Sequence, residues 1–176
     1  MVQTAARLFQ RDGYHATSWR GLVEEADAPW GSIHHHFPGG KEELGLEAVR
    51  LGASAVDAMF EHCFDTHDDP AEAVAAAFAL SADLMVGSDY ETGCPVATVA
   101  LETVATPGPL RDAARDAFGR WEATLARRFR RAGVRRPRET ATGVLALFEG
   151  ALLLSRVRRD RRPMQLASRQ ARLLID

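Results

Sequence analysis

The chain has little cysteine and almost no lysine. Lys41 is the only lysine among 22 basic residues in a sequence of 176, a bias of composition that indicates no function by itself. Cys63 and Cys94 are too few for a disulfide framework and fit a reducing compartment. No stretch reaches the roughly 18 consecutive apolar residues of a membrane span, and the first residues show no charged-then-apolar signal pattern. We therefore expect a cytoplasmic protein with no membrane partner.

The sequence patterns of enzymes are also missing. The sequence has no glycine-rich phosphate loop and no nucleophile elbow. It also has no carboxylate pair that spacing alone could bring together. Six potential metal ligands lie between His62 and Asp69, but their spacing matches no standard zinc pattern, and a polar loop explains them better. The run His34-His35-His36 cannot converge on one metal because consecutive helical residues point in different directions. We predict no enzymatic activity, no metal and no cofactor.

The charge of the chain is small in total but unevenly distributed. The net charge is −2, yet residues 127–162 contain twelve arginines and only three acids. Residues 1–45 have a net charge of −2, which is low for a surface that binds a polyanion. A solvated surface around loops is the simplest explanation of the arginine-rich stretch, and weak nonspecific contact with nucleic acid is the alternative.

The sequence predicts an all-α fold, because Ala, Leu, Arg and Glu dominate and the alternation typical of strands is missing. Apolar spacing and the positions of glycine and proline predict about nine helices. Their expected ranges are 2–12, 19–26, 29–37, 41–64, 71–86, 96–105, 110–132, 137–157 and 163–175.

The second and third of these helices are joined by a three-residue turn, which is typical of a helix-turn-helix. Ala26 supplies the small residue where the two helices meet, and Asp27 tolerates the left-handed backbone of the turn. Ile33 and Phe37 are expected to face inward. The outward face, which would read the major groove, comprises Trp30, Gly31, Ser32, His34 and His35. The alternative is a small three-helix bundle that does not bind DNA.

Several spaced motifs agree with one known family. They are Ala5-Ala6-Arg7-Leu8-Phe9, Gly13-Tyr14-His15-Ala16-Thr17-Ser18 and Gly31-Ser32-Ile33-His34-His35-His36-Phe37-Pro38-Gly39-Gly40-Lys41-Glu42-Glu43-Leu44. Together they resemble the N-terminal signature of the TetR family of repressors. A weaker similarity, to the LmrA-like subgroup, comes from Gly93-Cys94-Pro95-Val96-Ala97 to Glu102. The resemblance implies a helix-turn-helix DNA-binding domain at 1–45 and a ligand-sensing and dimerisation domain at 46–176.

The resemblance also implies which residues contact DNA. Thr17 and Ser18 would hold phosphates at the start of the second helix, and His34, His35 and Lys41 would touch phosphates. Bases or backbone in the major groove would be approached by Trp30, Gly31 and Ser32.

The segment from Thr140 to Leu154 is apolar nearly all round, which predicts burial on more than one side. One side can face the core of the subunit, and the other a second copy of the same helix. A four-helix interface would be completed by Leu166, Leu173 and Leu174. The alternative is a central helix in a monomer.

An effector pocket is implied mainly by the resemblance. The residues expected to line it are Phe78, Leu84, Met85, Val99, Glu102, Phe118, Trp121 and Phe148. For each apolar one, ordinary core packing is the alternative. Glu102 and Glu149 are expected in apolar surroundings, where they would meet either a ligand or arginines. We thus predict a ligand-responsive repressor that binds a palindromic operator as a homodimer, with a helical adaptor that does not bind DNA as the alternative.

Overall fold

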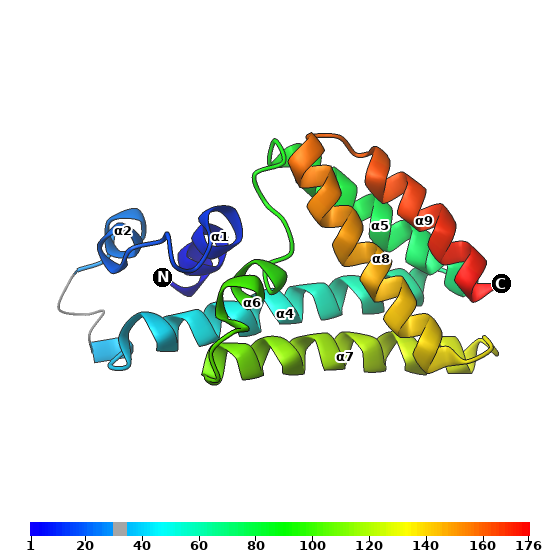
Figure 1. Cartoon of the computed structure of the whole chain (residues 1–176), viewed down its shortest axis with the longest axis horizontal. Helices are drawn as coiled ribbons and strands as arrows, with labels where there is room; N and C mark the ends of the chain where they lie inside the picture. Colours follow the sequence, from blue (N-terminus) through cyan, green and yellow to red (C-terminus); the bar gives the residue numbers. More distant parts are fainter. Residues whose placement is uncertain (30–34) are drawn as a thin grey trace. The chain divides into compact units, whose positions relative to one another are not determined.

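A computed structural model describes residues 1–29 and 35–176, which form eight helices and no strand (Figure 1). This confirms the predicted all-α class. The predicted third helix falls mostly on residues 30–34, which lie outside the described residues, and the other eight predicted helices are present. Their bounds are α1 Val2–Asp12, α2 Trp19–Glu25, α4 Gly40–Thr66, α5 Pro70–Gly87, α6 Ala97–Thr103, α7 Pro109–Arg131, α8 Pro137–Arg158 and α9 Arg162–Ile175.

Local chemistry explains the ends of the first two helices. Gly13 ends α1 with a φ of 92°, and its N–H donates to the carbonyl oxygen of Phe9 at 3.0 Å. At the start of α2, the Ser18 hydroxyl accepts a hydrogen bond from the N–H of Gly21 at 2.9 Å. Asp27 follows α2 with a φ of 45°, so the left-handed turn residue predicted from the sequence is confirmed.

The chain divides into two compact units. The first unit comprises Met1–Ser54 and Cys94–Ala117, and the second comprises Ala55–Gly93 and Phe118–Asp176. Both α4 and α7 contribute to each unit. The boundary expected after residue 45 lies within α4. It separates a DNA-binding from an effector-sensing part, which the compact units do not test, so it stays a prediction.

The core of the first unit forms where α1 contacts α2 and α6. Its buried apolar residues include Ala5, Leu8, Phe9, Leu22 and Val23. Tyr14 extends this core, since its ring centroid lies 5.3 Å from that of Phe9. Because α6 belongs to this unit, α1 is packed against a helix from about ninety residues further along the chain.

Aromatic residues dominate the core of the second unit. The Phe78 and Phe148 rings meet edge to face with their centroids 5.1 Å apart, and Phe60 lies 5.5 Å from Phe148. Trp121 and Phe129 are fully buried. Around them, α9 packs against both α5 and α8 (Figure 1).

Two helices, α5 and α8, are long and apolar enough to cross a membrane by length and composition alone. Neither helix is an uninterrupted apolar run, so the sequence alone did not indicate this. In each helix, 44% of the most apolar 18-residue segment is buried inside the structure. Length and composition alone do not establish a membrane span, because the core helix of a soluble protein can be as long and as apolar.

Candidate nucleic-acid interface

Thr17 and Ser18 lie in the loop between α1 and α2, and their hydroxyl groups have different roles. The Thr17 side chain is buried, and its hydroxyl donates to the carbonyl oxygen of Gly13 at 2.7 Å, which fixes the shape of the loop. Ser18 is exposed and caps α2 through Gly21. The structure therefore assigns the capping of α2 to Ser18.

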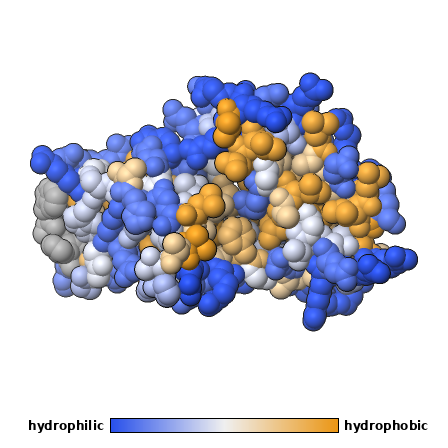
Figure 2. Space-filling model, viewed as in Figure 1, coloured by the Kyte–Doolittle hydropathy of each residue, from blue (hydrophilic) through white to orange (hydrophobic). Residues whose placement is uncertain are grey.

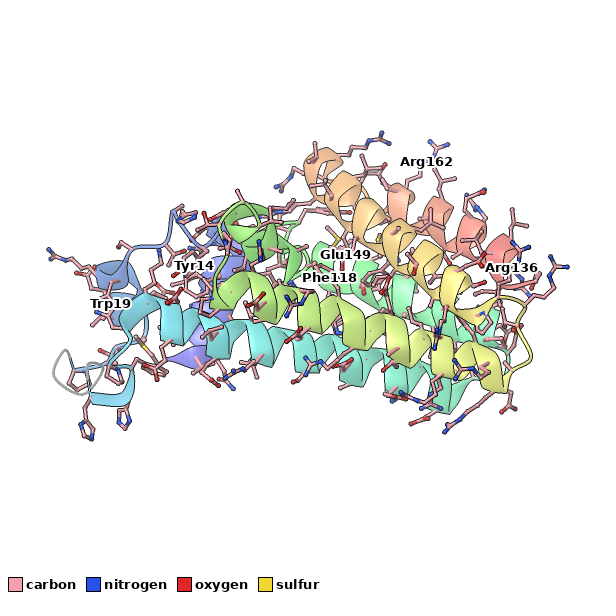
Figure 3. The ribbon with its side chains drawn as sticks, turned by 60° about the horizontal axis from the view of Figure 1, so that its bottom comes forward. Tyr14, Trp19, Phe118, Arg136, Glu149 and Arg162 are labelled. Carbon is pink, nitrogen blue, oxygen red and sulfur yellow. The ribbon has the colours of Figure 1, made fainter. Side chains whose placement is uncertain are left out.

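Lys41 lies near the start of α4 with its ammonium group over the ring of Tyr14. The Nζ atom is 4.4 Å from the ring centroid, the geometry of a cation–π contact. Burial lowers the pKa of Lys41, and the negative charge of Glu102 acts in the opposite direction. Burial also raises the pKa of Tyr14. Tyr14, on the loop between α1 and α2 (Figure 3), therefore contacts the ammonium group that is predicted to bind phosphate.

The predicted reading helix is described only at its end. Trp30, Gly31, Ser32 and His34 lie outside the described residues, as does Ile33. His35 is exposed, as predicted, and its ring centroid lies 5.6 Å from that of the exposed His36. Phe37, which was expected to face inward, is half-buried. The predicted base and phosphate contacts of this helix stay predictions.

Glu102 lies on α6 and contacts His15, a contact that was not expected from the sequence. Its carboxylate accepts a hydrogen bond from the backbone N–H of His15 at 2.6 Å, and its own carbonyl oxygen lies 3.3 Å from Nε2 of His15. Its side chain is exposed, so the expected apolar surroundings are wrong for this residue. No sequence signal indicated the contact, because the two residues are 87 positions apart.

The residues predicted to bind an effector do not share one unit. Val99 and Glu102 belong to the first unit and the others to the second. The apolar ones are mostly buried, Phe118 is half-buried, and Leu84 is 62% exposed because its neighbours on α5 take the core side. Phe78 borders a groove of about 240 Å³, whose other lining residues are Ala75, Ala79, Ala82, Arg161, Met164, Gln165 and Ser168. The predicted effector contacts remain untested.

Exposed apolar side chains gather on α8 and α9 (Figure 2). One side of α8 is buried, as predicted for a helix that is apolar nearly all round. The other side is exposed, with Leu153, Leu154 and Val157 between 45% and 75% accessible. On α9, Leu166, Leu173 and Leu174 are 43–69% exposed. We call these six residues the α8–α9 face. Arg136 and Arg162 lie at the beginnings of the two helices (Figure 3).

In the described residues, the short helices α1 and α2, the left-handed turn at Asp27 and the long α4 follow the order of elements in a helix-turn-helix regulator. Residues 2–48 match the domain described as "Bacterial regulatory proteins, tetR family". Residues 70–170 match the domain described as "Transcriptional regulator LmrA/YxaF-like, C-terminal domain". The chain belongs to the TetR family and is a DNA-binding transcriptional regulator, not an enzyme. This sets aside the adaptor alternative.

Relatives support this assignment along the whole chain. The HTH-type transcriptional regulator YxaF of Bacillus subtilis is 35% identical over 99% of this chain and 93% of its own length. The HTH-type transcriptional regulator LmrA of the same organism is 35% identical over 93% of this chain and 88% of its own. In fold, the chain is similar to the crystal structure of a regulatory protein TetR from Rhodobacter sphaeroides. That similarity has a TM-score of 0.91 at 20% identity and covers 99% of this chain and 96% of the other.

Proposed function

We propose that two copies of this chain form a homodimer that binds a palindromic operator and is released by a small molecule. The observation that carries the proposal is the α8–α9 face. Six large apolar side chains on two adjacent helices are accessible in the single chain, and α8 and α9 are packed against each other. A second copy of the same pair of helices would cover this face and complete a four-helix interface.

The dimer gives the protein two DNA-binding heads (residues 1–45). Two heads related by a two-fold axis read two half-sites about one helical turn apart, roughly 34–36 Å. In each head, Ser18 and Lys41 contact phosphates, and Trp30 and Ser32 approach the bases. Thr17 supports these phosphate contacts by holding the loop, because its buried hydroxyl donates its one proton to the carbonyl oxygen of Gly13.

The effector would act by shifting a population. The ligand-free dimer holds its heads at operator spacing and blocks transcription in the cytoplasm. A small molecule that binds another arrangement of the protein more tightly reduces the population able to bind the operator. The size of this shift is limited by the ratio of the molecule's affinities for the two arrangements. Because α4 belongs to both units, it provides a continuous element that links effector binding to the head.

Selection of DNA from a random duplex library, followed by footprinting, tests the operator. We expect the selected sequence to be a palindrome protected over two half-sites. The variant Leu153→Glu/Val157→Glu places charge on the α8–α9 face, so we expect a monomer by analytical ultracentrifugation and at least about a hundredfold weaker operator binding.

The matched control is Leu84→Glu, because Leu84 is 62% exposed on α5 and lies outside the α8–α9 face. It should remain dimeric and bind DNA as the wild type does. A Leu153→Glu/Val157→Glu variant that stays dimeric would show that α8 and α9 do not form the interface.

A further inference from the structure

The loop between α1 and α2 is fixed by a carboxylate from α6. One oxygen of Glu102 accepts the His15 backbone N–H at 2.6 Å. The other oxygen occupies the place of a side chain at Gly13, because a Cβ added there would overlap it. Gly13 also has a φ of 92°, which side chains rarely adopt. Glycine at this position therefore both ends α1 and makes room for the carboxylate.

The same loop organises the groups expected to contact DNA. Thr17 bonds back to the Gly13 carbonyl, which connects the Glu102 contact to Ser18 at the start of α2. On the other side, the Tyr14 ring lies under the ammonium of Lys41. Tyr14 itself rests on Gly45 of α4, where a Cβ would come within 3.0 Å of the ring. A shift of this loop would therefore move Ser18 and the Tyr14 ring that supports the Lys41 ammonium.

We propose that Glu102 is a positioning residue for DNA binding. Its carboxylate holds residues 13–18 so that Ser18 and Lys41 are presented to the phosphates of the duplex. This inference rests on the proposed DNA contacts of the head. It gives Glu102 a role different from the effector contact expected from sequence.

The charge and the hydrogen bond of Glu102 have opposite effects, and two variants separate them. The negative charge of Glu102 influences Lys41 and weakens attraction to DNA. The hydrogen bond to His15 favours binding because it orders the loop. Glu102→Gln keeps an acceptor oxygen and removes the charge, whereas Glu102→Ala removes both. A purely electrostatic role predicts tighter binding for both variants, but a positioning role predicts weaker binding for Glu102→Ala only.

The test uses the full-length protein, and the probe is the duplex that the wild type selects from a random library. For Glu102→Ala we expect about tenfold or more loss of affinity, the factor of one charge-assisted hydrogen bond. The slope of its affinity against salt concentration should be shallower by about one phosphate contact, because Tyr14 no longer holds the Lys41 ammonium in position. Glu102→Gln should bind at least as tightly as the wild type. The matched control is Glu91→Ala, since Glu91 is an exposed carboxylate in the second unit.

Amide hydrogen exchange measured by NMR reports the contact independently of DNA. The His15 amide should exchange about tenfold or more faster in Glu102→Ala than in the wild type, and near the wild-type rate in Glu102→Gln. Unchanged exchange in Glu102→Ala overturns the contact. Faster exchange with unchanged DNA affinity overturns the positioning role. A wild-type protein that selects no duplex instead contradicts the proposed function, while the exchange experiment still tests the contact.

Discussion

The two units of this protein are stabilised in different ways. In the first unit, a small apolar core is accompanied by polar contacts that fix a loop, such as those of Glu102 with His15 and Thr17 with Gly13. In the second unit, large aromatic side chains pack against one another, with Phe148 between Phe60 and Phe78. Burial of apolar area contributes stability with little directional preference, whereas hydrogen bonds to backbone determine where a loop lies. We therefore expect substitutions to reduce stability in the second unit and DNA affinity in the first.

The largest expected effect is that of Trp121→Ala in the second unit. Trp121 is fully buried, and its ring meets Phe118 edge to face with centroids 5.2 Å apart. Its removal leaves a cavity and should lower the free energy of unfolding by about 3–5 kcal/mol, as measured by urea denaturation. Leu84→Ala, at a position that is 62% exposed, should change it by no more than about 0.5 kcal/mol. Equal effects of the two variants would contradict the aromatic core as the source of stability.

An intermediate effect is expected for Lys41→Ala, and it concerns affinity rather than stability. Lys41 is the predicted phosphate ligand that lies over Tyr14. Its loss should weaken binding to specific and random duplexes alike and flatten the salt slope by about one unit, as measured by fluorescence anisotropy across salt concentrations. Arg115→Ala is a suitable control, because Arg115 is exposed and paired with Asp112 on α7. An unchanged slope for Lys41→Ala would remove Lys41 from the DNA contacts.

The same contrast explains what could be predicted from the sequence. Helix bounds were accurate where local signals coincide: α1 has its predicted bounds, and α8 and α9 begin within one residue of expectation beside Pro137 and Pro163. The family was recognised because its motifs lie in the short N-terminal helices and loops. All of these signals depend on residues close together in the chain.

Contacts between distant segments could not be predicted. Glu102 was expected in apolar surroundings because its neighbours in sequence are apolar, but short α6 turns it toward the loop of residues 13–18. Leu84 was expected to line a pocket, which stays a prediction, and its 62% exposure could not be foreseen because it depends on which side of α5 faces the core. Helical periodicity determines which residues share a face. Periodicity does not determine which segment of the chain, or whether solvent, contacts that face.

The smallest expected effect concerns Asp57, on the part of α4 that belongs to the second unit. Burial raises the pKa of this carboxyl group above its ordinary value, and the ion pair with Arg120, at 3.7 Å, offsets only part of the effect. The folded protein therefore holds the Asp57 proton more tightly than the unfolded chain does. At neutral pH the charged Asp57 therefore lowers the free energy of unfolding. This destabilisation is relieved as the pH falls through the folded-state pKa and the carboxylate takes up a proton.

Asp57→Asn removes the buried charge without changing the shape of the side chain. We expect it to raise the free energy of unfolding at pH 7 by less than about 1 kcal/mol, because the site is partly solvated. It should also remove this component of the pH dependence between pH 4 and pH 7, as measured by urea denaturation across that range. Lower stability of Asp57→Asn at pH 7 would mean that the attraction to Arg120 exceeds the cost of burial. Polar pairing, rather than apolar packing alone, would then stabilise the second unit too, and the contrast between the two units would be weaker than the aromatic core implies.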